Sequence, residues 1–274
     1  MVKFFSMNEK IYNVRINRNE VLRYLGFTKN VQADIKTGAD AETALPADAK
    51  IDQTKNAAST GNAENNSVDH NIAAQIQRCE KMVLDAAQPK YVYRVLPIER
   101  TDDKIRLSGT SLCIEGKDAE KLLSECSSCI VMAATVGQKT DMMLRRAQVY
   151  SMADAVILDS CASSAIESIC DQLNEDLRKE FESKGLFLTD RYSPGYGDMP
   201  LSMQTELCRL LQTEKRIGLS VSPGLTLTPS KSVTAIIGIS DRPQKMREVS
   251  CDGCRLKDTC NLRKAGQTCG NRKE

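Results

Sequence analysis

The sequence predicts an α+β fold, with a mixed or antiparallel twisted sheet and covering helices. Two runs read as core strands: residues 91–98 alternate and are rich in β-branched and aromatic residues, and residues 130–137 form an apolar run that ends in Gly. Residues 153–183 carry large apolar residues every three or four positions, as an amphipathic helix requires. Strands and helices are mixed without strict strand–helix–strand alternation, which argues against a parallel, doubly wound sheet. No Gly-x-Gly-x-x-Gly follows a predicted strand, so we expect no dinucleotide site.

The remaining elements follow the same two periodicities. Asn17-Arg18-Asn19-Glu20 precedes Val21, Leu22 and Leu25, which is typical of a helix start with an apolar face. Further helices are expected over residues 71–86, 118–124, 140–150 and 201–211, and further strands over residues 112–114 and 232–239.

Composition divides the chain into four segments. Residues 1–30 are expected to be an ordered N-terminal part of the main domain, which resumes over residues 70–248. Residues 31–69 contain almost no large apolar side chains, so they cannot offset their ordering entropy and are interpreted as a disordered linker or insertion. Residues 249–274 form a Cys-rich tail.

Charge and composition exclude several classes of function. With 38 Lys+Arg against 36 Asp+Glu there is no electrostatic case for a nucleic-acid partner. No apolar run reaches the roughly 20 residues needed to span a bilayer, and the apolar start is too short for a secretory signal. Eleven Cys without such a signal indicate a reducing, cytoplasmic location with thiols or metal ligands rather than disulfides. Because His70 is the only His, a His-based metal site or a Ser-His-Asp triad is not expected.

Residues 191–198, Arg-Tyr-Ser-Pro-Gly-Tyr-Gly-Asp, are the strongest functional signal. Pro fixes φ and Gly permits backbone conformations that other residues resist, so this octet is expected to hold a defined loop with its backbone groups exposed to a ligand. Arg191 could pair bidentately with a carboxylate. The alternative is a surface turn that needs Pro and Gly for its geometry alone.

Arg191, Pro194, Gly195 and Tyr196 resemble the Arg-x-x-Pro-Gly-Tyr motif of the activation domain of vitamin B12-dependent methionine synthase. The resemblance covers roughly residues 85–245. Gly197-Asp198 stands where the family has Pro followed by a variable residue, a pattern that we associate with the free-standing bacterial versions. It implies an activation-domain-like fold with an S-adenosylmethionine site.

The resemblance also implies roles for single residues. Arg191 would contact the methionyl carboxylate, and Ser193 and Gly195 would contact the ligand through their backbone groups. Tyr196 matches the tyrosine that follows the glycine in the family's site. Glu167, on the long helix, would match a ligand-contacting glutamate; without the resemblance it reads as a solvated helix face.

Two further segments extend the resemblance. Residues 134–137 resemble the family's Ala-Thr-x-Gly and are interpreted as an ordinary strand-to-helix turn, and residues 230–234 resemble a small-residue run near the cofactor face. The family's tyrosine after the last strand and its aspartate near the start of the domain have no match here.

The function implied by the resemblance is reductive reactivation of a B12-dependent methionine synthase. S-adenosylmethionine would act as methyl donor to cob(II)alamin, a methyltransferase role carried out on a cobalamin held by a separate chain. The expected partners are a cobalamin-binding domain of methionine synthase, or a related corrinoid protein, and a flavodoxin or ferredoxin-like electron donor.

Cysteines suggest an alternative. Cys251, Cys254, Cys260 and Cys269 put four soft ligands in a short polar tail, which suits Zn²⁺ or an iron–sulfur cluster. The chain could therefore be a redox or docking module for a corrinoid protein that carries such a metal. Cys126 and Cys129 border a predicted core strand and are expected to pack there rather than to do redox chemistry.

Overall fold

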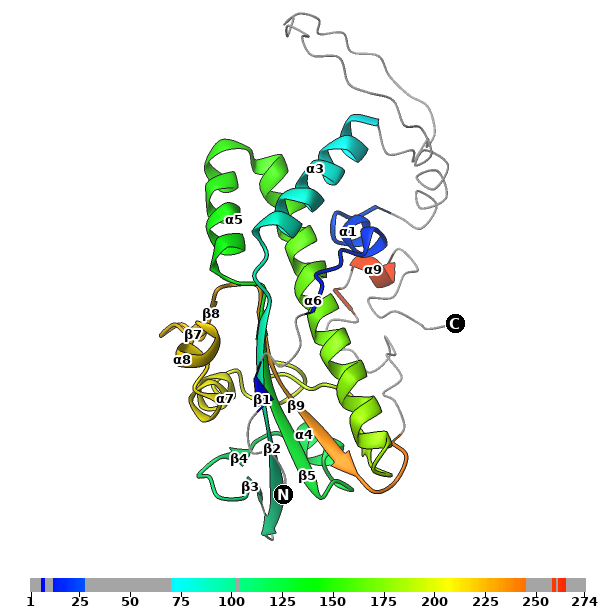
Figure 1. Cartoon of the computed structure of the whole chain (residues 1–274), viewed down its shortest axis with the longest axis vertical. Helices are drawn as coiled ribbons and strands as arrows, with labels where there is room; N and C mark the ends of the chain where they lie inside the picture. The colour runs from blue at the N-terminus through cyan, green and yellow to red at the C-terminus, as the bar shows by residue number, and fades with distance from the viewer. Residues whose placement is uncertain are drawn as a thin grey trace, which may run out of the picture.

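An antiparallel sheet of seven strands organises the chain (Figure 1). The computed structural model describes residues 6–7, 12–27, 70–101, 104–244, 258–259 and 261–264. The strand order is β4-β3-β2-β5-β9-β6, with β1 paired to β2, and every pairing is antiparallel. The predicted α+β class is thereby confirmed. The strands are β1 (Ser6–Met7), β2 (Lys90–Thr101), β3 (Lys104–Leu107), β4 (Cys113–Ile114), β5 (Ser128–Thr135), β6 (Phe187–Leu188) and β9 (Ser232–Ser240), and β7 (Ser220–Val221) pairs with β8 (Leu227–Thr228) in a small separate ribbon.

Six of the helices among the described residues form where the apolar periodicity predicted them, and α8 and α9 were not predicted. Asn17 caps α1, since its side chain accepts the N–H of Asn19, and Ser151 caps the longest helix by accepting the N–H of Asp154. The helices are α1 (Arg18–Tyr24), α3 (His70–Ala86), α4 (Lys117–Leu122), α5 (Gln138–Tyr150), α6 (Met152–Glu182), α7 (Met203–Leu211), α8 (Thr213–Ile217) and α9 (Asn261–Lys264).

Both faces of the sheet are covered, which explains why β5 reads as a continuous apolar run. Ile130, Met132 and Ala134 of this strand pack into a core shared with α1, α3, α5 and α6. The alternate residues Cys129, Val131 and Ala133 pack into a second core with α4, α7 and α8. Successive side chains of a strand point to opposite faces, so a strand buried on both sides shows no alternation of polar and apolar residues.

The sequence did not predict β1, β3, β6, β7, β8 or α8. Four of these are two-residue strands, too short to show a period, and they exist because a neighbouring strand or turn supplies their hydrogen bonds. The expected linker at 31–69 lies outside the described residues, as does nearly all of the 249–274 tail. No helix among the described residues has the length and apolarity to cross a membrane. The cytoplasmic location stays a prediction.

Candidate ligand site

The octet runs along the open edge of β9. Leu188 of β6 pairs with Ile239, and the chain then continues beside β9 so that Tyr192 and Ile236 exchange both backbone hydrogen bonds, at 2.9 and 2.8 Å. Because successive residues of an extended segment alternate, Arg191 and Tyr192 reach opposite faces of the sheet. The Arg191 side chain contacts α6, whereas Tyr192 is buried in the second core.

A tight turn follows at Pro194-Gly195. The Gly195 N–H donates to the Met199 carbonyl at 3.0 Å, and the Tyr196 N–H donates to the Ser193 carbonyl at 3.2 Å. Gly195 and Gly197 both have positive φ, +89° and +52°. The octet is therefore an ordered loop, and Tyr196 places its ring largely in solvent.

Gly197 and Asp198, which depart from the family motif, connect the loop to α4. The Asp198 carboxylate accepts the N–H groups of Lys117 and Asp118, at 2.8 and 3.1 Å, at the start of that helix. A Cβ on Gly197 would overlap the Tyr192 hydroxyl and the Asp118 carboxylate, so only Gly fits this position. These two residues fix the loop against the start of α4.

Arg191 and Glu167, both named as candidate ligand contacts, form an ion pair with each other. The Arg191 Nη2 atom lies 3.1 Å from Glu167 Oε2 and 3.0 Å from Asp171 Oδ1, both on α6. The arginine side chain is only 18% exposed, whereas those of Glu167 and Asp171 are 42% and 73% exposed. Its other terminal nitrogen, Nη1, is buried and has no hydrogen-bond partner among the described residues. A buried donor without an acceptor is unfavourable by about 1–3 kcal/mol, so a ligand carboxylate that reaches it would relieve that cost.

A second cation reaches the same face of α6. Lys231, in the loop before β9, places Nζ 2.8 Å from Asp159 Oδ1 and donates to Ser163 Oγ at 2.9 Å. Asp159, Ser163, Glu167 and Asp171 recur every four residues and so form one polar stripe along the helix. Arg191 and Lys231 each lie against this stripe, with their cationic ends held between α6 and the sheet edge.

The loop that carries Lys231 is tied to α5. Asp141 Oδ1 accepts both the backbone N–H and the hydroxyl of Ser230, at 3.0 and 2.6 Å. Burial raises the pKa of Asp141, but these bonds and the nearby Arg145 guanidinium outweigh burial and hold the pKa below its ordinary value. The carboxylate stays ionised and fixes the loop.

Tyr24 of α1 borders the site as well. Burial raises the pKa of the Tyr24 phenol, and the carboxylates of Glu20 and Glu167 raise it further. The sequence did not point to Tyr24, and it included Lys231 only as part of the 230–234 run expected near the cofactor face. The packing of α1 and of the β9 loop on α6 places both side chains beside the polar stripe.

The turn at residues 134–137 has the structural role expected of it. Thr135 is fully buried, and its hydroxyl accepts the Gly137 N–H at 3.1 Å and the Ser232 hydroxyl at 2.8 Å. These bonds close the turn between β5 and α5.

All the cysteines in the described residues except the half-buried Cys113 are buried. Burial raises the pKa of Cys126 to about 11 and that of Cys129 to about 12, so both thiols are protonated at neutral pH, as the core-packing interpretation requires. Within the described ranges, no group of three or more His, Cys, Asp or Glu could hold a metal ion. Cys251, Cys254, Cys260 and Cys269 lie outside those ranges.

Comparison with solved structures finds proteins of similar fold. No family model and no curated protein sequence matches the chain. The fold is similar to that of a solved structure described as the crystal structure of the MetH reactivation domain bound to AdoHcy. The two share 18% sequence identity over 72% of this chain and 73% of that one, with a TM-score of 0.49.

Proposed function

We propose that this chain binds S-adenosylmethionine between α6 and the octet and serves in the reductive reactivation of a B12-dependent methionine synthase or related corrinoid protein. The observation that carries the proposal is Arg191: a largely buried guanidinium with an unpartnered Nη1, held beside Glu167 at a Pro-Gly turn. The motif resemblance of the octet supports the same ligand.

The charges of the site suit a zwitterionic sulfonium ligand. Arg191 would pair with the methionyl carboxylate, and the exposed Asp171 side chain would swing away to admit it. Glu167 would then accept from the ammonium group or from a ribose hydroxyl. The backbone of Ser193–Tyr196 would fix the ligand's position, because its turn is already formed without ligand.

The chain's own contribution is binding and orientation. A cobalamin on the partner protein would supply the cobalt that accepts the methyl group, and a separate donor such as a flavodoxin or ferredoxin-like protein would supply one electron. Removal of the methyl group from the sulfonium leaves S-adenosylhomocysteine on this chain. Holding the sulfonium still against the docked partner makes the transfer effectively intramolecular.

Titration calorimetry with S-adenosylmethionine and S-adenosylhomocysteine tests the site. Saturable binding to the wild-type chain that is lost in Arg191→Ala is the expected result. The reactivation role is tested by mixing the chain, S-adenosylmethionine and a reductant with cob(II)alamin-loaded methionine synthase and following the corrinoid spectrum. Binding without any change in that spectrum would leave a ligand site but refute the reactivation role.

A second candidate function rests on the tail. Cys251, Cys254, Cys260 and Cys269 are compactly spaced, in contrast to the described cysteines, which are spread through the cores. We propose that they hold Zn²⁺ or an iron–sulfur cluster that docks on the corrinoid protein or supplies it with electrons. Metal analysis and visible absorbance of anaerobically purified protein, measured beside Cys254→Ser, distinguish the two. A brown protein carries a cluster, and a colourless protein with one zinc carries a structural ion. A protein that contains neither zinc nor a cluster would refute the proposal.

A further inference from the structure

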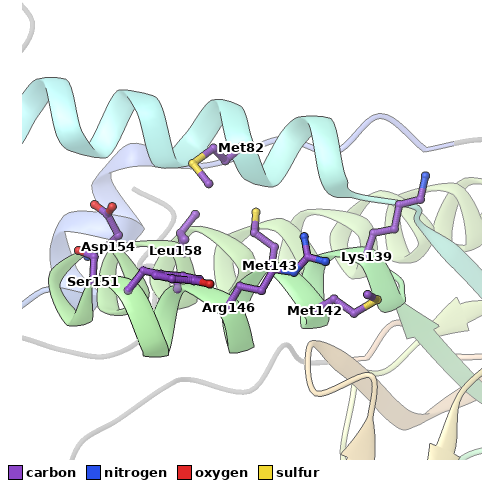
Figure 2. Close-up of a pocket in the computed structure, with 10 residues that line it drawn as sticks. Met82, Lys139, Met142, Met143, Arg146, Ser151, Asp154 and Leu158 are labelled. Carbon is purple, nitrogen blue, oxygen red and sulfur yellow. The ribbon is translucent and has the colours of Figure 1, made fainter.

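A hollow of about 450 Å³ lies between α3 and α5, on the first turns of α6 (Figure 2). Met82 points from α3 toward Met143 of α5, with Leu158 of α6 beneath them. The hollow is apolar, and Met142 lies along the same side of α5. None of its lining residues belongs to the candidate ligand site.

The uncompensated charge around the hollow is positive. Lys139 and Arg146 line it from α5, and neither forms an ion pair with any described residue. The acidic lining residue, Asp154, is already neutralised, since Gln75 donates to it at 2.6 Å and Arg78 pairs with it at 2.7 Å. Figure 2 places Asp154 at one end of the hollow and Lys139 at the other.

Apolar surface continues outside the hollow. Tyr150, at the end of α5, is 86% exposed although it lines the hollow, and the adjacent Val149 is 79% exposed. A small ligand in 450 Å³ would leave these side chains in water, whereas a polypeptide laid along α5 would cover them. Methionines adapt to irregular partners, and Met, Tyr and Arg are enriched in protein interfaces.

We propose that this surface docks an amphipathic helix of another protein, with apolar side chains in the hollow and acidic side chains against Lys139 and Arg146. Helices bind to apolar grooves through residues spaced at three and four positions, and the unpaired cations select an acidic flank. A second copy of this chain does not fit as well, because two such surfaces would set Lys139 and Arg146 of one copy against the same cations of the other.

Synthetic peptides test the charge and the shape together. One fluorescein-labelled helical peptide carries Leu at three- and four-residue spacing with Glu on both flanks, and its counterpart carries Lys in place of every Glu. Anisotropy with the full chain should show micromolar binding of the acidic peptide and at least tenfold weaker binding of the basic one. Met143→Asp should abolish binding, and so should Met142→Asp, whose half-exposed position makes it tolerant of the change.

Two adjacent arginines give a matched control. Arg146→Gln should weaken the acidic peptide about fivefold, whereas Arg145→Gln should not, because Arg145 is turned toward Asp141 and paired with it at 3.1 Å. Equal effects of the two variants, or equal binding of both peptides, would overturn the proposal. So would dimerisation in sedimentation velocity that Met142→Asp removes, or stoichiometric binding of decanoate with no binding of the acidic peptide.

Discussion

Replacing Arg191 should separate ligand affinity from stability. In the ligand-free protein its ion pairs involve Glu167 and Asp171, which are 42% and 73% exposed, so they contribute at most about 1 kcal/mol to folding. Arg191→Ala also removes the buried Nη1 atom that has no hydrogen-bond partner, and this gain in stability offsets part of the loss of the ion pairs. For Arg191→Ala we expect a fall in melting temperature of about 2–4 °C or less.

The affinity for S-adenosylmethionine should respond much more strongly. A hydrogen bond to a charged group contributes about 1.5–3 kcal/mol, which corresponds to a roughly 10- to 150-fold increase in the dissociation constant. Arg191→Lys should show a smaller loss, because it keeps the charge but not the planar fork. Calorimetry for affinity and thermal melting for stability make the two measurements on the same preparations.

Arg178→Ala is the matched control. Arg178 lies on α6 and pairs with Asp190, the residue before Arg191, at 3.4 Å. Its removal should cost similar stability without changing affinity. Unchanged affinity in Arg191→Ala, or an equal loss in Arg178→Ala, would refute the assignment of Arg191 as the carboxylate partner.

Three further predictions concern the scaffold. Gly197→Ala should lose about 2 kcal/mol or more in urea unfolding, because its Cβ would displace the Tyr192 hydroxyl; Gly185→Ala, with positive φ but open space, should lose only about 1–2 kcal/mol. The lowered pKa of Asp141 means that its stabilising effect is complete above the unfolded pKa of about 4 and is lost as pH falls through the folded value; melting from pH 3 to 7 should show a shallower acid loss in Asp141→Asn, and an unchanged profile would contradict the reasoning. Burial raises the pKa of Cys129 to about 12, so a thiol reagent at pH 7.5 should modify it only after unfolding, and rapid labelling of the native protein, read by mass spectrometry, would count against its core position.

Long periodic segments could be predicted from the sequence, and short ones could not. β2, β5, β9 and α6 each contain enough residues to show a period, so their type and approximate bounds followed from the pattern. The four-residue β3 is different: it pairs with the far end of β2, and that contact, rather than its own composition, makes it a strand.

The residues of the candidate site also divide into those that the sequence could predict and those that it could not. Arg191 and Glu167 could be named because a motif and a helix match pointed to them, and the structure brings them together. Tyr24 could not be named, and Lys231 only as a member of the 230–234 run, since nothing local in the sequence says which side chains of α1 and of the β9 loop approach the polar stripe of α6. Tertiary packing, not motif chemistry, supplies these two neighbours.

The extended run beside β9 makes this segment intolerant of a change in length. Arg191 contacts α6 and Tyr192 packs in the second core only because successive side chains of this extended segment point to opposite faces of the sheet. Deleting or inserting a single residue between β6 and Tyr192 would exchange the two sides, burying a cation in an apolar core and turning a tyrosine toward α6. Variants of this protein should therefore keep the number of residues between β6 and Tyr192 unchanged.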